Sequence, residues 1–139
     1  MGFYDDEFIE FAKELILEND FMVLVNGFYT NLINEKYPFF ESRIDFSKLR
    51  NSRFYRIDGV IISDYIKKII EENNLNIEED IIYVGDSSTE NEYKFKLKYL
   101  IKILSNIMEI PQHHYFISEK EKWCLYIAFE DYLEFGLLE

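Results

Sequence analysis

The segment covering residues 110–137 reads IPQHHYFISEKEKWCLYIAFEDYLEFGL and decides the fold. After the break at Pro111, it contains three runs rich in aromatic and β-branched residues, at 115–117, 123–129 and 133–137. Such runs are typical of strands, and the two charged connections between them are short. We therefore predict three consecutive strands that form the core of a mainly antiparallel sheet.

The middle run is apolar on both of its faces. One face carries Trp123, Leu125, Ile127 and Phe129, and the other carries Cys124, Tyr126 and Ala128. Side chains alternate between the two faces of a strand, so both faces of this one need cover. We expect it to lie centrally in the sheet, with helices covering at least one side.

Apolar periodicity upstream predicts three helices. The first follows Asp5 and Asp6 and extends to about Asn19, and the second begins at Val60 and ends before Asn73. The third covers 90–108, where Thr89 and Glu92 match the capping box that begins many helices.

Two shorter segments upstream are prone to form strands, and one segment is ambiguous. Residues 54–57 are β-prone and are followed by a turn at Asp58 and Gly59, and residues 81–84 read as a short buried strand. Residues 21–33, preceded by Asp20 as a candidate N-cap, fit a buried helix, but 22–25 fit a strand equally well.

The length and these patterns define the expected fold class. A chain of 139 residues with 48% hydrophobic and 18% aromatic residues is large enough to bury a core in one domain, 1–139. We predict an α+β fold in which several helices pack on a small, mainly antiparallel C-terminal sheet.

The net charge is −12 and is unevenly distributed. Residues up to Ile70 include 12 acidic and 9 basic side chains, whereas those from Glu71 onward include 15 and 6, which gives −3 and −9. This charge repels phosphate backbones and anionic lipids, and it attracts basic proteins. Direct binding to nucleic acid or to a membrane is therefore not expected. The one concentration of basic residues could form a phosphate site or pair with the excess carboxylates: Arg43, Lys48, Arg50, Arg53 and Arg56.

The sequence favours a cytoplasmic protein without a cofactor. Its single cysteine, Cys124, lies in an apolar run, as expected for a small buried side chain in a reducing compartment. The first residues lack the features of a signal peptide, and no apolar run approaches the roughly 20 residues that span a bilayer. Phosphate-loop and dinucleotide-binding motifs are absent.

Two motifs invite a catalytic or metal-binding interpretation. Residues 85–88, Gly-Asp-Ser-Ser, lie between a predicted strand and a predicted helix, where a serine nucleophile or an anion site could be built. The string resembles the first block of the Gly-Asp-Ser hydrolases, but Ile110 and Pro111 stand where their Asp-x-x-His motif needs its Asp. The pair His113 and His114 would point to opposite faces of a strand, so it cannot readily chelate one metal ion.

The acidic groups near the predicted sheet form a better candidate site. If the ends of the strands bring them together, they form an acidic patch with exposed tyrosines that suits Lys and Arg of a basic protein. The candidate partner-binding residues are Asp86, Glu119, Glu121, Tyr126, Glu130, Asp131, Tyr132 and Glu134.

Several strings in the C-terminal half resemble a known class of proteins. They are residues 82–87 (IYVGDS), 110–116 (IPQHHYF), 123–124 (WC) and 134–136 (EFG), and they are similar to small bacterial immunity proteins of contact-dependent inhibition and related polymorphic toxin systems. The resemblance implies a non-enzymatic cytoplasmic antidote that binds and blocks one cognate toxin domain. Such toxins include basic nucleases. The alternatives are a nucleic-acid-mimicking regulator or anti-restriction protein and, third, a small serine hydrolase.

Overall fold

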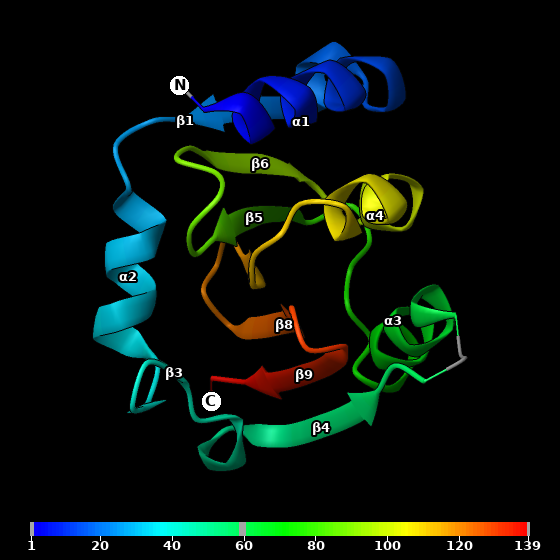
Figure 1. Cartoon of the computed structure of the whole chain (residues 1–139). Helices are drawn as coiled ribbons and strands as arrows, with labels where there is room; N and C mark the ends of the chain where they lie inside the picture. Colours follow the sequence, from blue (N-terminus) through cyan, green and yellow to red (C-terminus); the bar gives the residue numbers. More distant parts are fainter. Residues whose placement is uncertain (1, 59–60, 139) are drawn as a thin grey trace.

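A computed structural model describes residues 2–58 and 61–138 of the chain. In this part, strands from the whole length of the chain form one seven-stranded sheet in the order β1-β6-β5-β7-β8-β9-β4, in which neighbouring strands are antiparallel (Figure 1). The strands are β1 (Phe21–Leu24), β4 (Arg50–Arg56), β5 (Asp80–Gly85), β6 (Glu92–Lys96), β7 (His114–Ser118), β8 (Trp123–Ala128) and β9 (Tyr132–Leu137).

The predicted C-terminal strands form the middle of this sheet. β7 is the central strand, β8 lies beside it, and every residue of both is buried. The expectation that β8 is covered is therefore confirmed. The α+β class with a mainly antiparallel sheet is also confirmed, and β1, β4, β5 and β6 extend the sheet beyond the C-terminal segment.

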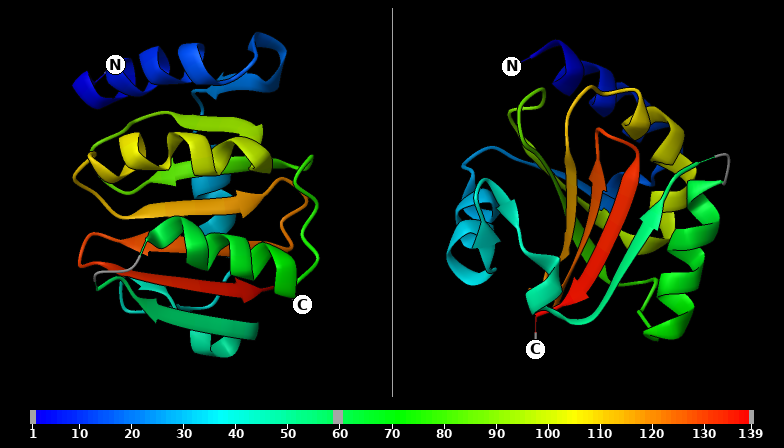
Figure 2. Two further views of the ribbon diagram at one scale, coloured as in Figure 1. Left: turned by 90° about the vertical axis from the view of Figure 1, so that its right-hand side faces the viewer. Right: turned by 60° about the horizontal axis from the view of Figure 1, so that its bottom comes forward.

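Three helices cover one face of the sheet: α1 (Phe3–Leu15), α3 (Ile62–Glu72) and α4 (Leu100–Met108). The left view of Figure 2 shows α3 and α4 in front of the sheet and nearly parallel to its strands, with α1 at the top of the view. Their apolar faces meet the inward side chains of the strands in one cluster, which includes Phe8, Ile66, Tyr83, Ile103 and Phe116. Burial of this apolar surface is the main stabilisation of the first face.

The opposite face has a separate cover. It consists of α2 (Phe28–Lys36), a short hairpin of β2 (Phe39–Phe40) and β3 (Arg43–Ile44), and a 3-10 turn at Phe46–Lys48. A second cluster forms here, in which Ile33 and Phe46 pack on Tyr115 and Tyr126. Contact is close enough that a Cβ on Gly136 would lie 2.6 Å from the Cβ of Leu49, so only glycine fits there.

Several predictions of local structure are confirmed. The first helix ends at Leu15, and the second covers Ile62–Glu72. The strand predicted at 54–57 belongs to β4, which ends at Arg56, and the strand predicted at 81–84 lies within β5. The ambiguous segment 21–33 contains both alternatives in succession, β1 and then α2, and Asp20 belongs to a 3-10 turn, not to an N-cap. The predicted turn at Gly59 and the helix start at Val60 lie outside the described residues.

The helix predicted at 90–108 is wrong in its first half. Residues 92–96 form β6, a 3-10 turn covers Leu97–Tyr99, and only Leu100–Met108 is helical. In β6, Tyr93 and Phe95 are both fully buried, which is the alternation of a strand.

The apparent capping box fails because Glu92 caps another helix. Its carboxylate accepts hydrogen bonds from the backbone N–H of Tyr29 at 3.1 Å, from the N–H of Thr30 at 2.7 Å and from the Thr30 hydroxyl at 2.6 Å, all in the first turn of α2. A carboxylate at this position satisfies free N–H groups and complements the helix dipole. The local pattern correctly indicates a capping role for Glu92, but the helix that it caps lies far away in the sequence.

Within residues 2–58 and 61–138, no helix is both long enough and apolar enough to cross a bilayer.

Candidate functional site

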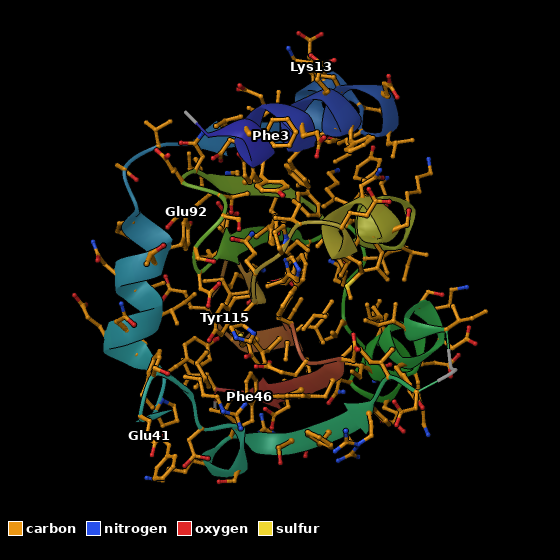
Figure 3. All side chains as sticks on the ribbon, viewed as in Figure 1. Phe3, Lys13, Glu41, Phe46, Glu92 and Tyr115 are labelled. Atoms are coloured by element: carbon orange, nitrogen blue, oxygen red, sulfur yellow. The ribbon has the colours of Figure 1, made fainter. Side chains whose placement is uncertain are left out.

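A cleft of about 310 Å³ opens between α2, the β2–β3 hairpin and one end of the sheet. We call it the α2 cleft; its polar lining includes Thr30, Arg43, Asp86 and His113, and Tyr115 and Tyr126 contribute to its wall. In Figure 3, Glu92, Tyr115 and Phe46 follow one another along the side of the sheet that faces α2. The sheet and its second cover together create this cleft, so it draws on residues from distant parts of the chain.

Asp86 lies at one end of the α2 cleft, directly after β5. Its Oδ1 accepts a hydrogen bond from the backbone N–H of His113 at 3.0 Å, and its own N–H donates to the His113 carbonyl at 3.3 Å. The side chain is exposed, and it forms no ion pair with any cation among the described residues. Asp86 therefore presents an uncompensated carboxylate at the cleft.

The buried side chain of Gln112 binds the backbone N–H groups of the loop that follows Asp86. The Oε1 atom of Gln112 accepts hydrogen bonds from the backbone N–H groups of Ser87, Ser88 and Thr89 at 3.2, 2.7 and 3.1 Å. Gln112 is buried, and its Nε2 donates to Tyr83 and Thr89. The loop therefore does not form the anion site that could be built at a helix N-terminus, because β6 follows it in place of a helix and a neutral oxygen accepts the hydrogen bonds of its N–H groups.

The serine of the same loop does not contact a histidine. The Ser87 hydroxyl donates to Asp86 Oδ1 at 3.3 Å. His113 Nδ1 instead receives a hydrogen bond from the Phe129 N–H at 3.0 Å and lies 3.1 Å from the Tyr126 hydroxyl. A serine nucleophile needs a base within hydrogen-bonding distance, so the contacts of Ser87 give the hydrolase interpretation no support.

The two histidines point to opposite faces of the sheet, as predicted. His113 faces the α2 cleft, whereas His114 is only 2% exposed and its Nδ1 lies 2.7 Å from the Tyr83 hydroxyl in the core of the other face. Burial lowers the pKa of His114 to about 4, although the nearby Asp86 acts in the opposite direction. Among residues 2–58 and 61–138, no group of three His, Cys, Asp or Glu side chains could hold a metal ion.

Arg43 occupies the other end of the α2 cleft, and its charge is already compensated. Its Nη1 donates to Glu134 Oε1 at 2.8 Å and to the Tyr132 hydroxyl at 2.9 Å, and its Cζ lies 5.6 Å from the centre of the Tyr132 ring. The Glu134 side chain is only 13% exposed. The ion pair between Arg43 and Glu134 holds the β2–β3 hairpin against β9. Of the other arginines in the basic segment, Arg53 pairs with Glu72 at 3.5 Å.

The structure divides the predicted acidic patch into two. Successive connections of an antiparallel meander lie at opposite ends of its strands, so Glu119 and Glu121 are far from Glu130 and Asp131. Glu119 pairs with Lys94 at 3.0 Å, and Glu121 pairs with Lys36 at 2.7 Å. The expectation that all these carboxylates share one surface is therefore wrong.

Of the other six predicted residues, Asp86 and Tyr126 line the α2 cleft itself, and the remaining four lie outside its lining. Tyr126 is 1% exposed and forms part of the wall, and Tyr132 and Glu134 hold Arg43. Asp86 and the turn at 129–131 remain accessible. In that turn Glu130 is 65% exposed, and Asp131 is exposed with a left-handed backbone (φ +64°).

The sequence interpretation missed Phe129. It was assigned to the apolar face of a strand, but β8 ends at Ala128 and the Phe129 side chain is 63% exposed. Its position beside Glu130 and Asp131 was the available signal. The contributions of Thr30 and Arg43 had no such signal, because they come from α2 and the hairpin, far away in the sequence.

Comparison of the chain with known protein families and with curated proteins gives no match.

Proposed function

We propose that this chain is an immunity protein that binds a cognate toxin domain and blocks it, without a catalytic step of its own. The observation that carries the proposal is the exposed turn of Phe129, Glu130 and Asp131, which contacts His113 in the lining of the α2 cleft, on a protein with a net charge of −12. We call the binding surface formed by Asp86, residues 129–131 and the α2 cleft the acidic face.

This combination has the properties of a protein-binding surface. Aromatic side chains contribute much of the energy of interfaces, and they do so best next to a pocket that the partner can fill. The surrounding negative charge accelerates association with a basic partner. A basic nuclease toxin is such a partner, and an antidote that covers its active site would keep nucleic acid out.

The resemblance in the C-terminal half also supports the proposal, and the residues that carry it belong mainly to the strands of the sheet. The strings similar to immunity proteins lie mostly in β5, β7, β8 and β9 and in the turns beside them. The buried Cys124, whose pKa is raised by burial, fits the reducing cytoplasm in which such an antidote acts. The proposal therefore places the protein in the cytoplasm.

The direct test is co-purification with the toxin domain encoded immediately upstream, together with protection of cells that express this toxin. We expect a stable complex and restored growth. Absence of both binding and protection would contradict the proposed function.

A charge variant tests the acidic face within this proposal. Glu130→Lys combined with Asp131→Asn raises the net charge by three while leaving at position 131 a residue that tolerates the left-handed backbone. A matched control, Glu10→Lys with Glu14→Gln, makes the same change on exposed residues of α1. The first variant should slow toxin association about tenfold at low salt, whereas the control should change it less than about twofold. Equal effects of the two variants would remove this face from the proposal.

A second candidate is a nucleic-acid-mimicking regulator, and α1 is the feature that favours it. The helix and the turn after it carry a series of exposed acids that form no ion pairs within the described part of the chain: Asp6, Glu7, Glu10, Glu14 and Glu18. A mimic would bind several DNA-binding proteins, whereas an immunity protein holds one partner. Pull-down with a panel of DNA-binding proteins distinguishes the two.

A further inference from the structure

We infer that the α2 cleft receives a Lys or Arg side chain of the protein partner, with the cationic group at Asp86. This inference rests on the proposed function and adds the chemistry by which the acidic face recognises its partner. It depends on three properties of the cleft, which are the separation of its two charged ends, the compensation of Arg43 and the aromatic wall.

The two charged ends of the cleft are associated with strands that lie three strand spacings apart in the sheet. Val84, Tyr115, Tyr126 and Glu134 are register neighbours on the adjacent strands β5, β7, β8 and β9. Adjacent strands lie about 4.8 Å apart, so the first and last of these backbones are about 14 Å apart. Asp86 follows β5, whereas Arg43 lies over β9. Asp86 and the Glu134 partner of Arg43 are therefore attached to strands at opposite ends of this span.

The charge at the Arg43 end is neutralised by a neighbouring side chain, whereas the charge at the Asp86 end is not. Glu134 neutralises Arg43 at 2.8 Å, so that this end offers little attraction to an anion. Asp86 accepts hydrogen bonds only from the His113 N–H and the Ser87 hydroxyl, as far as the described residues extend. Neither donor carries a full charge. The cleft as a whole therefore favours a cation, and it favours it at the Asp86 end.

The wall between the two ends can contact both the methylene groups and the charged group of a Lys or Arg side chain. Phe39, Tyr115 and Tyr126 provide aromatic surface, and methylene groups of Lys or Arg pack on such surface while the charged head remains polar. An aromatic ring also attracts a cation over its face. Arg43 already uses this chemistry, because its guanidinium lies over Tyr132 and pairs with Glu134.

A protein partner explains the surroundings of the cleft better than a free amine. Phe129 and Glu130 are exposed beside His113, outside the cleft. A small amine would leave them unused, whereas a partner that inserts one side chain would cover them at the same time. An anchor in a pocket with an aromatic and charged rim is the usual arrangement of a binding hot spot.

The test uses N-acetyl-arginine methylamide and N-acetyl-lysine methylamide as probes of the full chain, followed by ¹H–¹⁵N NMR. Neutral N-acetyl-norleucine methylamide and acidic N-acetyl-glutamate methylamide are the comparison compounds. We expect the basic probes to shift the amide signals of Thr30, Asp86 and His113 most strongly, with dissociation constants on the order of millimolar for a single exposed site.

Two variants make the test specific for Asp86. Asp86→Asn removes the charge but keeps an oxygen for the His113 N–H, and should weaken binding of the basic probes about fivefold; Glu10→Gln on α1 should leave it unchanged. Thermal unfolding checks that both variants are folded. Unchanged binding by Asp86→Asn, or preferential binding of the acidic probe, would overturn the inference.

The same pair of variants separates this inference from the proposed function. A toxin that binds wild type and Asp86→Asn with equal affinity would leave the immunity function standing and remove the anchor. Binding of the basic probes at Asp86 without any toxin complex would contradict the function while supporting the chemistry of the cleft.

Discussion

His114 makes the stability of the fold depend on pH. In the folded protein the imidazole lies beside the Tyr83 hydroxyl and is removed from water, and this burial lowers its pKa to about 4 from the ordinary 6.5. As pH falls through 6.5, the unfolded chain binds a proton that the folded chain does not. The stability that the neutral His114 provides is therefore complete above pH 6.5 and is lost progressively down to about pH 4.

The size of this effect follows from the two pKa values. A difference between 6.5 and about 4 corresponds to about 3 kcal/mol of unfolding free energy. Many small domains have a total stability of only about 5–15 kcal/mol, so a loss of this size is easily measured. His114→Asn keeps a polar atom near the position of Nδ1 but removes the titration.

Urea denaturation at pH 7 and pH 4, followed by the fluorescence of the buried Trp123, measures the effect. Between these pH values, wild type should lose about 3 kcal/mol more unfolding free energy than His114→Asn. Comparing the two changes cancels the other titrating groups and the packing cost of the substitution. An equal loss in wild type and His114→Asn would refute the reasoning.

Three substitutions test contacts that hold distant segments together, each by urea denaturation. Glu92→Gln weakens the cap of α2 and should lower the unfolding free energy by about 1–2 kcal/mol. The control Glu90→Gln, at an exposed position, should lower it by less than about 0.5 kcal/mol. Equal losses would mean that Glu92 does not stabilise α2 as a cap. Asp5→Ala removes the acceptor of two backbone N–H groups and of the Tyr93 hydroxyl, and should cost about 3 kcal/mol. Gly136→Ala forces its Cβ against Leu49 and should cost about 1–3 kcal/mol; a neutral result would mean that Leu49 moves aside freely.

The parts of the fold that were predictable are those that local patterns determine. β7, β8 and β9 follow one another with short connections, so alternation and turn residues were sufficient to identify them. Residues 90–108 show where this reasoning fails, because Glu92 satisfies the local pattern of a cap while its carboxylate binds α2. A capping motif specifies what a side chain can do, but tertiary structure decides which helix receives it.

The candidate site was likewise predictable only where a local sequence pattern specifies it. Glu130 and Asp131 were correctly assigned to an exposed turn, since a hairpin connection reaches solvent wherever the sheet lies. Whether two connections share an end of the sheet depends on strand direction, and for this reason Glu119 and Glu121 were wrongly joined to them. The α2 cleft had no signature in the sequence, because α2 and Arg43 reach it only through the second cover of the sheet.

The strand order also determines when the chain can fold during synthesis. Both edges of the sheet come from early segments, and their partners come late: Phe21 pairs with Phe95, and Phe54 pairs with Glu134. The strands β7, β8 and β9 leave the ribosome after all the other strands of the sheet. Until then the aromatic side chains of β5 and β6 have no completed core, which is the condition under which nascent chains aggregate. We therefore expect the newly synthesised protein to depend on chaperones until the strands at 114–137 have emerged, and to fold in one late step.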